Sequence, residues 1–127
     1  MLYIDWEYYN SLYDTVSEND FDKLNAKACA KLDVYTHMRA RNFMAAYDAD
    51  MATPFQEQVY TQIQNTVCEI INLVSVQDAA GMGSGIASTS NDGYSETYKV
   101  TTQAEKDAEV IALIQQGLGG TGLAGAL

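Results

Sequence analysis

A helix start at residues 53–56 is the strongest local signal in the sequence. Thr53 can cap the first turn, Pro54 suits the first helical position, and Gln56 stands three residues after the cap. Large apolar side chains then recur at steps of three or four, which places them on one helix face. They are Phe55, Val59, Ile63, Val67, Ile70 and Val74, with Cys68, Ile71 and Leu73 widening the stripe. Because such a stripe can touch neighbours on more than one side, we expect this helix to be the central one.

Two helices are expected before the central one. Asp5 can cap a short helix that carries Trp6 and Tyr9 on one face. A longer helix begins where Ser17 and Asp20 resemble a capping box. Its apolar stripe consists of Phe21, Leu24, Ala28, Leu32, Tyr35 and Met38. This spacing predicts one continuous buried face on a single long helix.

The composition changes after the central helix. Residues 81–91 are rich in Gly, Ser, Ala and Thr, and a turn signal follows at residues 92–93, Asp-Gly. The runs that flank this turn, 86–88 and 94–100, suit extended strands. We therefore predict an extended arm or β-hairpin over residues 81–100.

The chain is expected to close with a helix and a tail. A capping box at residues 102–105 starts the last helix, and Gly117 ends it. Residues 117–127 are mostly glycine and small side chains, so they should form a flexible tail. The predicted fold is mainly α: a small bundle of about four helices with a β-hairpin-like arm between the last two. Residues 1–116, arm included, would form one domain.

The chain is strongly acidic. It has 127 residues, the size of one domain, and a formal net charge of -10. Proteins that read duplex DNA or RNA normally present a basic surface, so this class is disfavoured. Most basic residues fall in one segment, as Lys23, Lys27, Lys31, Arg39 and Arg41. This segment is either a solvated helix face or a surface for an acidic partner.

No targeting or membrane segment is predicted. The first seven residues are acidic and lack the basic start and apolar run of a signal peptide. No stretch approaches the roughly 20 apolar residues of a membrane span. Cys29 and Cys68 both fall within helical patterns, without a Cys-x-x-Cys pair. We expect reduced, buried thiols, as in a cytosolic protein.

No catalytic, metal-binding or cofactor-binding residue is predicted. His37 is the single histidine, so most catalytic triads, which need a positioned histidine as the base, are excluded. Asp48 and Asp50 begin like a calcium loop, but the later positions lack the turn glycine and the closing carboxylate. The spaced glycines at residues 81–85 lack the third glycine of a dinucleotide fingerprint. The chain is therefore expected not to be an enzyme.

Four segments together carry a resemblance to a known family. Residues 86–98 are similar to a Ser-rich Gly-Tyr-Ser-x-x-Tyr segment, and residues 118–123 to a Gly-Thr-Gly-Leu terminus. Residues 21–39 and 67–71 resemble the second and central helices of the same proteins. These are the head-tail connector, or head-completion adaptor, proteins of long-tailed bacteriophages and prophages. One departure is the end of the chain, residues 124–127, where members often carry an aromatic or basic stretch.

The resemblance implies a structural protein of the virion, made in the host bacterial cytoplasm. Members form a homo-oligomeric ring, usually a dodecamer, that docks beneath the portal protein and extends the DNA channel toward a stopper or tail-completion protein. DNA would pass without sequence-specific binding, and no catalytic residue, cofactor or membrane contact is implied. We predict subunit contacts at Ile86, Ser88, Tyr94 and Tyr98, and a portal-docking tail made of Gly119, Gly120, Thr121, Gly122 and Leu123.

Two other functions stay open at this point. The chain could be a small acidic regulator that binds another protein through one helix face without catalytic activity. It could also be an acidic hydrolase subunit that holds a metal with Asp48, Asp50 and Glu57.

Overall fold

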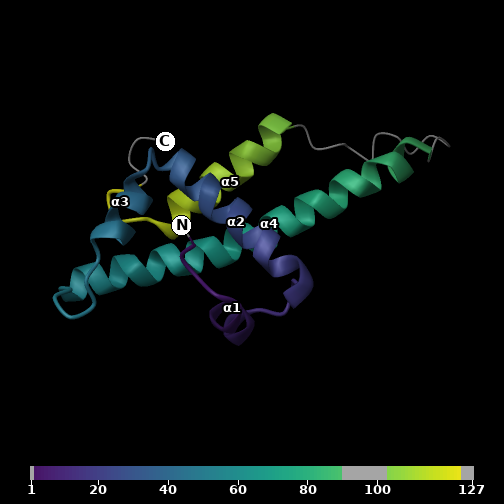
Figure 1. The fold of residues 1–127 in the computed structure, drawn as a ribbon. Helices are drawn as coiled ribbons and strands as arrows, with labels where there is room; N and C mark the ends of the chain where they lie inside the picture. Colours follow the sequence, from purple (N-terminus) through teal and green to yellow (C-terminus); the bar gives the residue numbers. More distant parts are fainter. Residues whose placement is uncertain (1, 90–102, 124–127) are drawn as a thin grey trace.

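The chain is mainly helical. The computed structural model describes residues 2–89 and 103–123, with the backbone alone for residues 79–89. Five helices form within these ranges: α1 (Trp6–Leu12), α2 (Glu18–Tyr35), α3 (Arg39–Ala46), α4 (Pro54–Thr89) and α5 (Gln103–Gly117). The described residues contain no β-strand. The predicted helical bundle is confirmed (Figure 1).

The helix start predicted at Thr53 is confirmed in atomic detail. The backbone N–H of Gln56 donates to the Thr53 hydroxyl at 3.1 Å, and the Thr53 N–H donates to the Gln56 side chain at 2.9 Å. Both donors would otherwise lack a partner at the first turn. From this start α4 runs as the long axis of the molecule, with α2 and α5 packed against it (Figure 1).

The core lies where α2 and α5 meet α4. Its fully buried apolar side chains come mainly from the stripes that the sequence predicts, including Phe21 and Leu32 on α2 and Ile63 and Ile70 on α4. Phe55 begins the α4 stripe but remains exposed, because α4 extends past its neighbours at that end. On α5, Val110 and Ile114 close the core.

The N-terminal residues are bound to α2 and α4. The Asp5 carboxylate accepts a hydrogen bond from the Tyr8 N–H at 2.8 Å, which confirms it as the cap of α1. The Tyr3 hydroxyl donates to the buried carboxylate of Asp33 on α2. The Tyr9 hydroxyl donates to Asn72 on α4. These contacts hold α1 against the side of the bundle.

The prediction that one long helix carries the whole stripe from Phe21 to Met38 is wrong. α2 ends at Tyr35, a tight turn follows, and α3 starts at Arg39. The Met38 N–H donates to the Asp33 carbonyl at 2.7 Å and the His37 N–H to the Val34 carbonyl at 3.1 Å, which is a Schellman ending. Amphipathic spacing continues across the turn, so the pattern does not reveal the break. Met38, expected in the buried stripe, is instead exposed.

This turn holds two side-chain-bearing residues in the left-handed region. His37 has φ 55° and Met38 has φ 66°. The left-handed conformation costs an ordinary residue about 1–2 kcal/mol, whereas glycine adopts it freely. His37→Gly should therefore raise the free energy of unfolding, by about 1 kcal/mol, in chemical denaturation. Ala30→Gly, at an exposed position inside α2, is the matched control and should lower it by a similar amount. A loss of stability in His37→Gly would contradict the turn geometry.

The predicted arm over residues 81–100 is wrong for its first part. α4 continues as a helix to Thr89, so the backbone at Ile86 and Ser88 is helical and not extended. Each glycine costs about 1 kcal/mol relative to alanine, but extending a formed helix needs no new nucleus. Residues 90–102, which include Tyr94 and Tyr98, lie outside the described residues.

Candidate functional site: an apolar groove beside α4 and α5

The residues predicted to dock on a portal lie against the bundle. The Gln62 side chain on α4 donates to the carbonyls of Gly117 at 3.2 Å and Gly119 at 3.1 Å. Leu118 between them is buried in the core, and Leu123 packs against the core as well. The sequence predicts a free tail from Gly117, whereas the structure holds residues 117–123 beside α4.

The chain turns back on itself within this segment. Gly120 and Gly122 have φ of 80° and 79°, values that a side chain would make unfavourable. The Thr121 hydroxyl donates to the Leu118 carbonyl at 2.6 Å and accepts from the Leu123 N–H at 3.1 Å. The Gly-Thr-Gly-Leu sequence thus forms a compact turn. Residues 124–127 lie outside the described residues.

A groove of about 640 Å³ opens to solvent beside α4 and α5. Tyr13, just after α1, lines it together with Leu73 and Val76 on α4 and Leu113 on α5. These α4 positions are three residues apart and therefore share one helix face. The lining is mostly apolar, so the groove suits the side chains of a protein segment.

Two carboxylates stand at this groove. Glu69 of α4 and Glu109 of α5 line it and are exposed. Burial, with a smaller contribution from the Glu69 charge, raises the pKa of Tyr13 above its usual value. Tyr13 is therefore a neutral hydrogen-bonding group at physiological pH, and the groove combines an apolar floor with negative charge.

The two cysteines are buried, as the sequence predicts. Burial raises the pKa of Cys29 to about 11 and that of Cys68 to about 12. Both are neutral thiols at pH 7, and a neutral thiol is a poor nucleophile. Their surroundings do not suit covalent catalysis.

The acidic residues considered for a metal do not gather into a site. Asp48, Asp50 and Glu57 are all exposed around the start of α4. Within the described part of the chain, no group of three or more His, Cys, Asp or Glu residues is placed to hold a metal ion. No helix in that part is long and apolar enough to cross a membrane.

No protein-family model, curated protein or solved structure matches the chain. The groove is the feature that sequence reasoning missed. A signal for it exists in the width of the α4 stripe, because Leu73 and Val76 extend the apolar face beyond what α2 alone would cover.

Proposed function

We propose that this chain is a structural connector of a bacteriophage particle. In this proposal identical copies form a ring under the portal, extend the DNA channel and join head to tail. The observation that supports it best is that α4 continues past the helices packed against it. Its last part, which begins the Gly/Ser-rich segment, therefore projects beyond the core (Figure 1). A helix that projects from a closed core is suited to contact a neighbouring molecule.

The segment after the core would join neighbouring copies. Ile86 and Ser88 stand on the projecting part of α4, and Tyr94 and Tyr98 follow them in the sequence. The isoleucine and the two tyrosines of this Gly/Ser-rich segment suit the groove beside α4 and α5 of the next copy. Contacts between unlike surfaces can close into a ring.

The C-terminal turn would face the portal. Gly119, Gly120 and Gly122 are exposed, Thr121 and Leu123 are partly buried, and Gln62 binds the Gly119 carbonyl. A preformed turn loses less conformational entropy on docking than a free tail. The net charge of -10 suits a channel that DNA traverses without sequence-specific binding, because acidic walls repel phosphates. A stopper or tail-completion protein would bind the other side.

The test mixes the purified full chain with the portal protein of the same phage or prophage. We expect the chain to co-sediment with the portal and to appear as a ring stacked on it in negative-stain electron microscopy. Truncation after Leu118 removes residues 119–127 but keeps the buried leucine, so it should retain the helical circular dichroism and lose portal binding.

Two results would contradict the proposal. One is a truncated chain that binds the portal as well as the full chain does, which would remove the role of residues 119–127. The other is a full chain that stays monomeric or dimeric and ignores the portal. That second result would favour the alternative, a small acidic regulator that receives a partner in the groove.

A further inference from the structure

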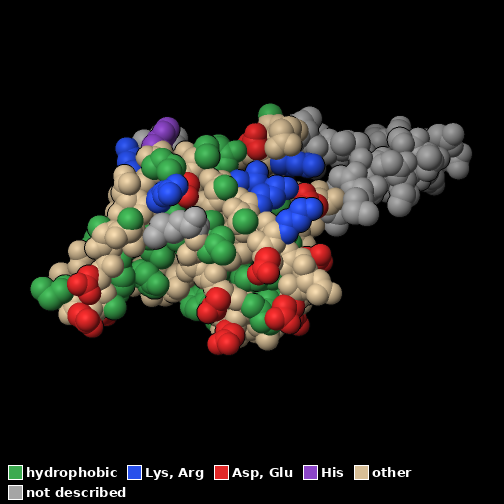
Figure 2. Space-filling model, in the orientation of Figure 1, with side chains coloured by type: hydrophobic (Ala, Val, Ile, Leu, Met, Phe, Trp, Pro, Cys, Tyr) green, Lys and Arg blue, Asp and Glu red, His purple; other side chains and the backbone are tan. Residues whose placement is uncertain are grey.

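Two exposed patches of opposite charge stand apart on the surface. The first, the basic turn, lies between α2 and α3 and consists of Val34, His37, Met38, Arg39 and Arg41. The second, the acidic tip, surrounds the start of α4 and consists of Asp48, Asp50, Met51, Phe55 and Glu57. Figure 2 shows hydrophobic and acidic side chains together at this tip, the far left of the view.

Both patches expose large apolar side chains beside their charges. Val34 is 66% exposed and Met38 40% in the basic turn, and Met51 is 78% and Phe55 55% in the acidic tip. Exposed apolar groups rimmed by charge are typical of protein contact sites, because association removes their surface from water. Each patch therefore has the make-up of an interface.

The charges of the two patches are complementary. The acidic tip holds three carboxylates, and no Lys or Arg stands between Arg41 and Lys99 in the sequence. The basic turn holds two arginines against the nearby carboxylate of Asp107 on α5, which interacts with Tyr35 and keeps its negative charge. A surface that is acidic and apolar fits one that is basic and apolar.

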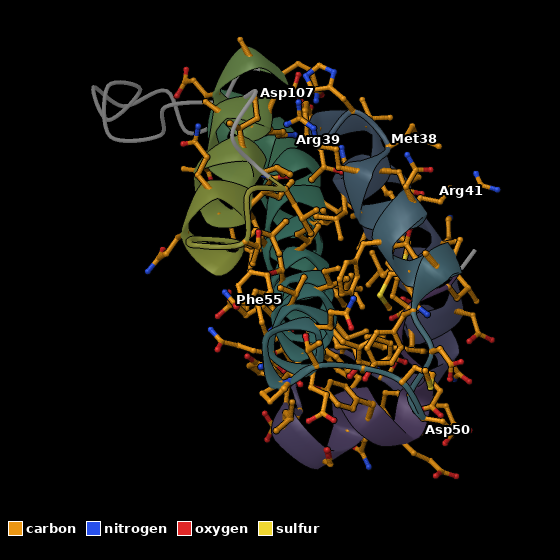
Figure 3. All side chains as sticks on the ribbon, turned by 90° about the vertical axis from the view of Figure 1, so that its left-hand side faces the viewer. Met38, Arg39, Arg41, Asp50, Phe55 and Asp107 are labelled. Atoms are coloured by element: carbon orange, nitrogen blue, oxygen red, sulfur yellow. The ribbon has the colours of Figure 1, made fainter. Side chains whose placement is uncertain are left out.

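The two patches do not meet within one copy. In Figure 3 the labelled Met38 and Arg39 lie in the upper part of the view, Phe55 lies near its middle on the left, and Asp50 lies at its lower right. We infer that the acidic tip of one copy docks on the basic turn of a second copy. The contact joins unlike surfaces, so each copy can use both at once and extend the assembly head to tail. The inference adds a contact between copies to the proposed function. Only the closure of the assembly into a ring rests on that proposed function.

Single charge reversals of the full chain test this contact. Arg39→Glu and Asp50→Lys each place like charges opposite one another, so each should weaken self-association about tenfold or more in sedimentation velocity at low salt. An equimolar mixture of the two variants should recover association, because the reversed turn then faces the reversed tip. The control is Asp22→Lys on the exposed side of α2, which changes the net charge as Asp50→Lys does and should leave association unchanged.

A second pair of variants tests the apolar part. Met51→Ser and Phe55→Ser remove exposed side chains, so the fold should persist by circular dichroism while association weakens. Three results would each overturn the inference. The wild-type chain could stay monomeric at low salt, the variants could associate as the wild type does, or the mixture of the two charge-reversed variants could fail to recover association. If self-association responds to the charge reversals but the chain does not bind the portal, this contact stands and the proposed function is wrong. If the chain binds the portal but its self-association does not respond to the charge reversals, the proposed function stands and this contact is wrong.

Discussion

Replacing Leu118 with alanine is expected to lower the free energy of unfolding by about 2–5 kcal/mol, the usual effect of truncating a buried leucine. Leu118 is 1% exposed although it follows the last helix, in a stretch whose composition is typical of a free tail. Its side chain lies in the core beside α4, and the surrounding atoms cannot fully close the cavity that alanine leaves. Urea denaturation followed by circular dichroism gives the difference.

Leu12→Ala is the matched control for this experiment. Leu12 is 53% exposed at the end of α1, so the same truncation should change stability by no more than about 0.5 kcal/mol. Equal effects of the two substitutions would mean that residues 117–123 are not packed on the bundle. The truncation after Leu118, used in the portal experiment, would then need a different interpretation.

The second large effect is expected at Gly117, where the end of α5 lies against Thr66 of α4. A Cβ atom at Gly117 would lie 3.2 Å from the Cβ and Cγ2 atoms of Thr66 and closer still to its hydroxyl. Thr66 is buried and its hydroxyl donates to the Gln62 carbonyl at 2.6 Å, so it cannot move away freely. Gly117→Ala should therefore cost about 1–3 kcal/mol of stability, although alanine favours helix.

A double-mutant cycle identifies the cause. Thr66→Ala removes the atoms that the new methyl group would strike, so the double variant should be more stable than the sum of the single effects predicts, by about 1–3 kcal/mol. Gly119→Ala is the control, because its Cβ would meet nothing closer than the Gln116 carbonyl at 3.4 Å. Additive effects of Gly117→Ala and Thr66→Ala would rule out this close approach.

The proposed contacts differ in how far the sequence reveals them. Composition shows the segregation of basic residues into one segment, and that observation leads to the basic turn. It does not show that Met38 and Val34 are exposed beside the arginines, because apolar spacing alone predicts Met38 on a buried face. Likewise Phe55 fits the α4 stripe by spacing but lies beyond the helices that could cover it.

The sequence by itself determined the helices whose ends carry their own hydrogen bonds. Thr53 and Gln56 cap α4, and Asp5 caps α1, through contacts with residues only three positions away. Such short-range contacts form wherever the local chain permits. The apolar stripes of α2 and α4 were readable for a similar reason, because helical spacing alone brings their side chains to one face.

Tertiary structure alone decided where the continuous pattern of α2 stops and what the glycine-rich residues 117–123 do. α2 breaks at His37 and Met38 despite uninterrupted spacing. Residues 117–123 are held because Leu118 finds space in the core and Gln62 reaches their carbonyls. Glycine permits several backbone conformations at small differences in free energy, so contacts with residues far away in the sequence select among them.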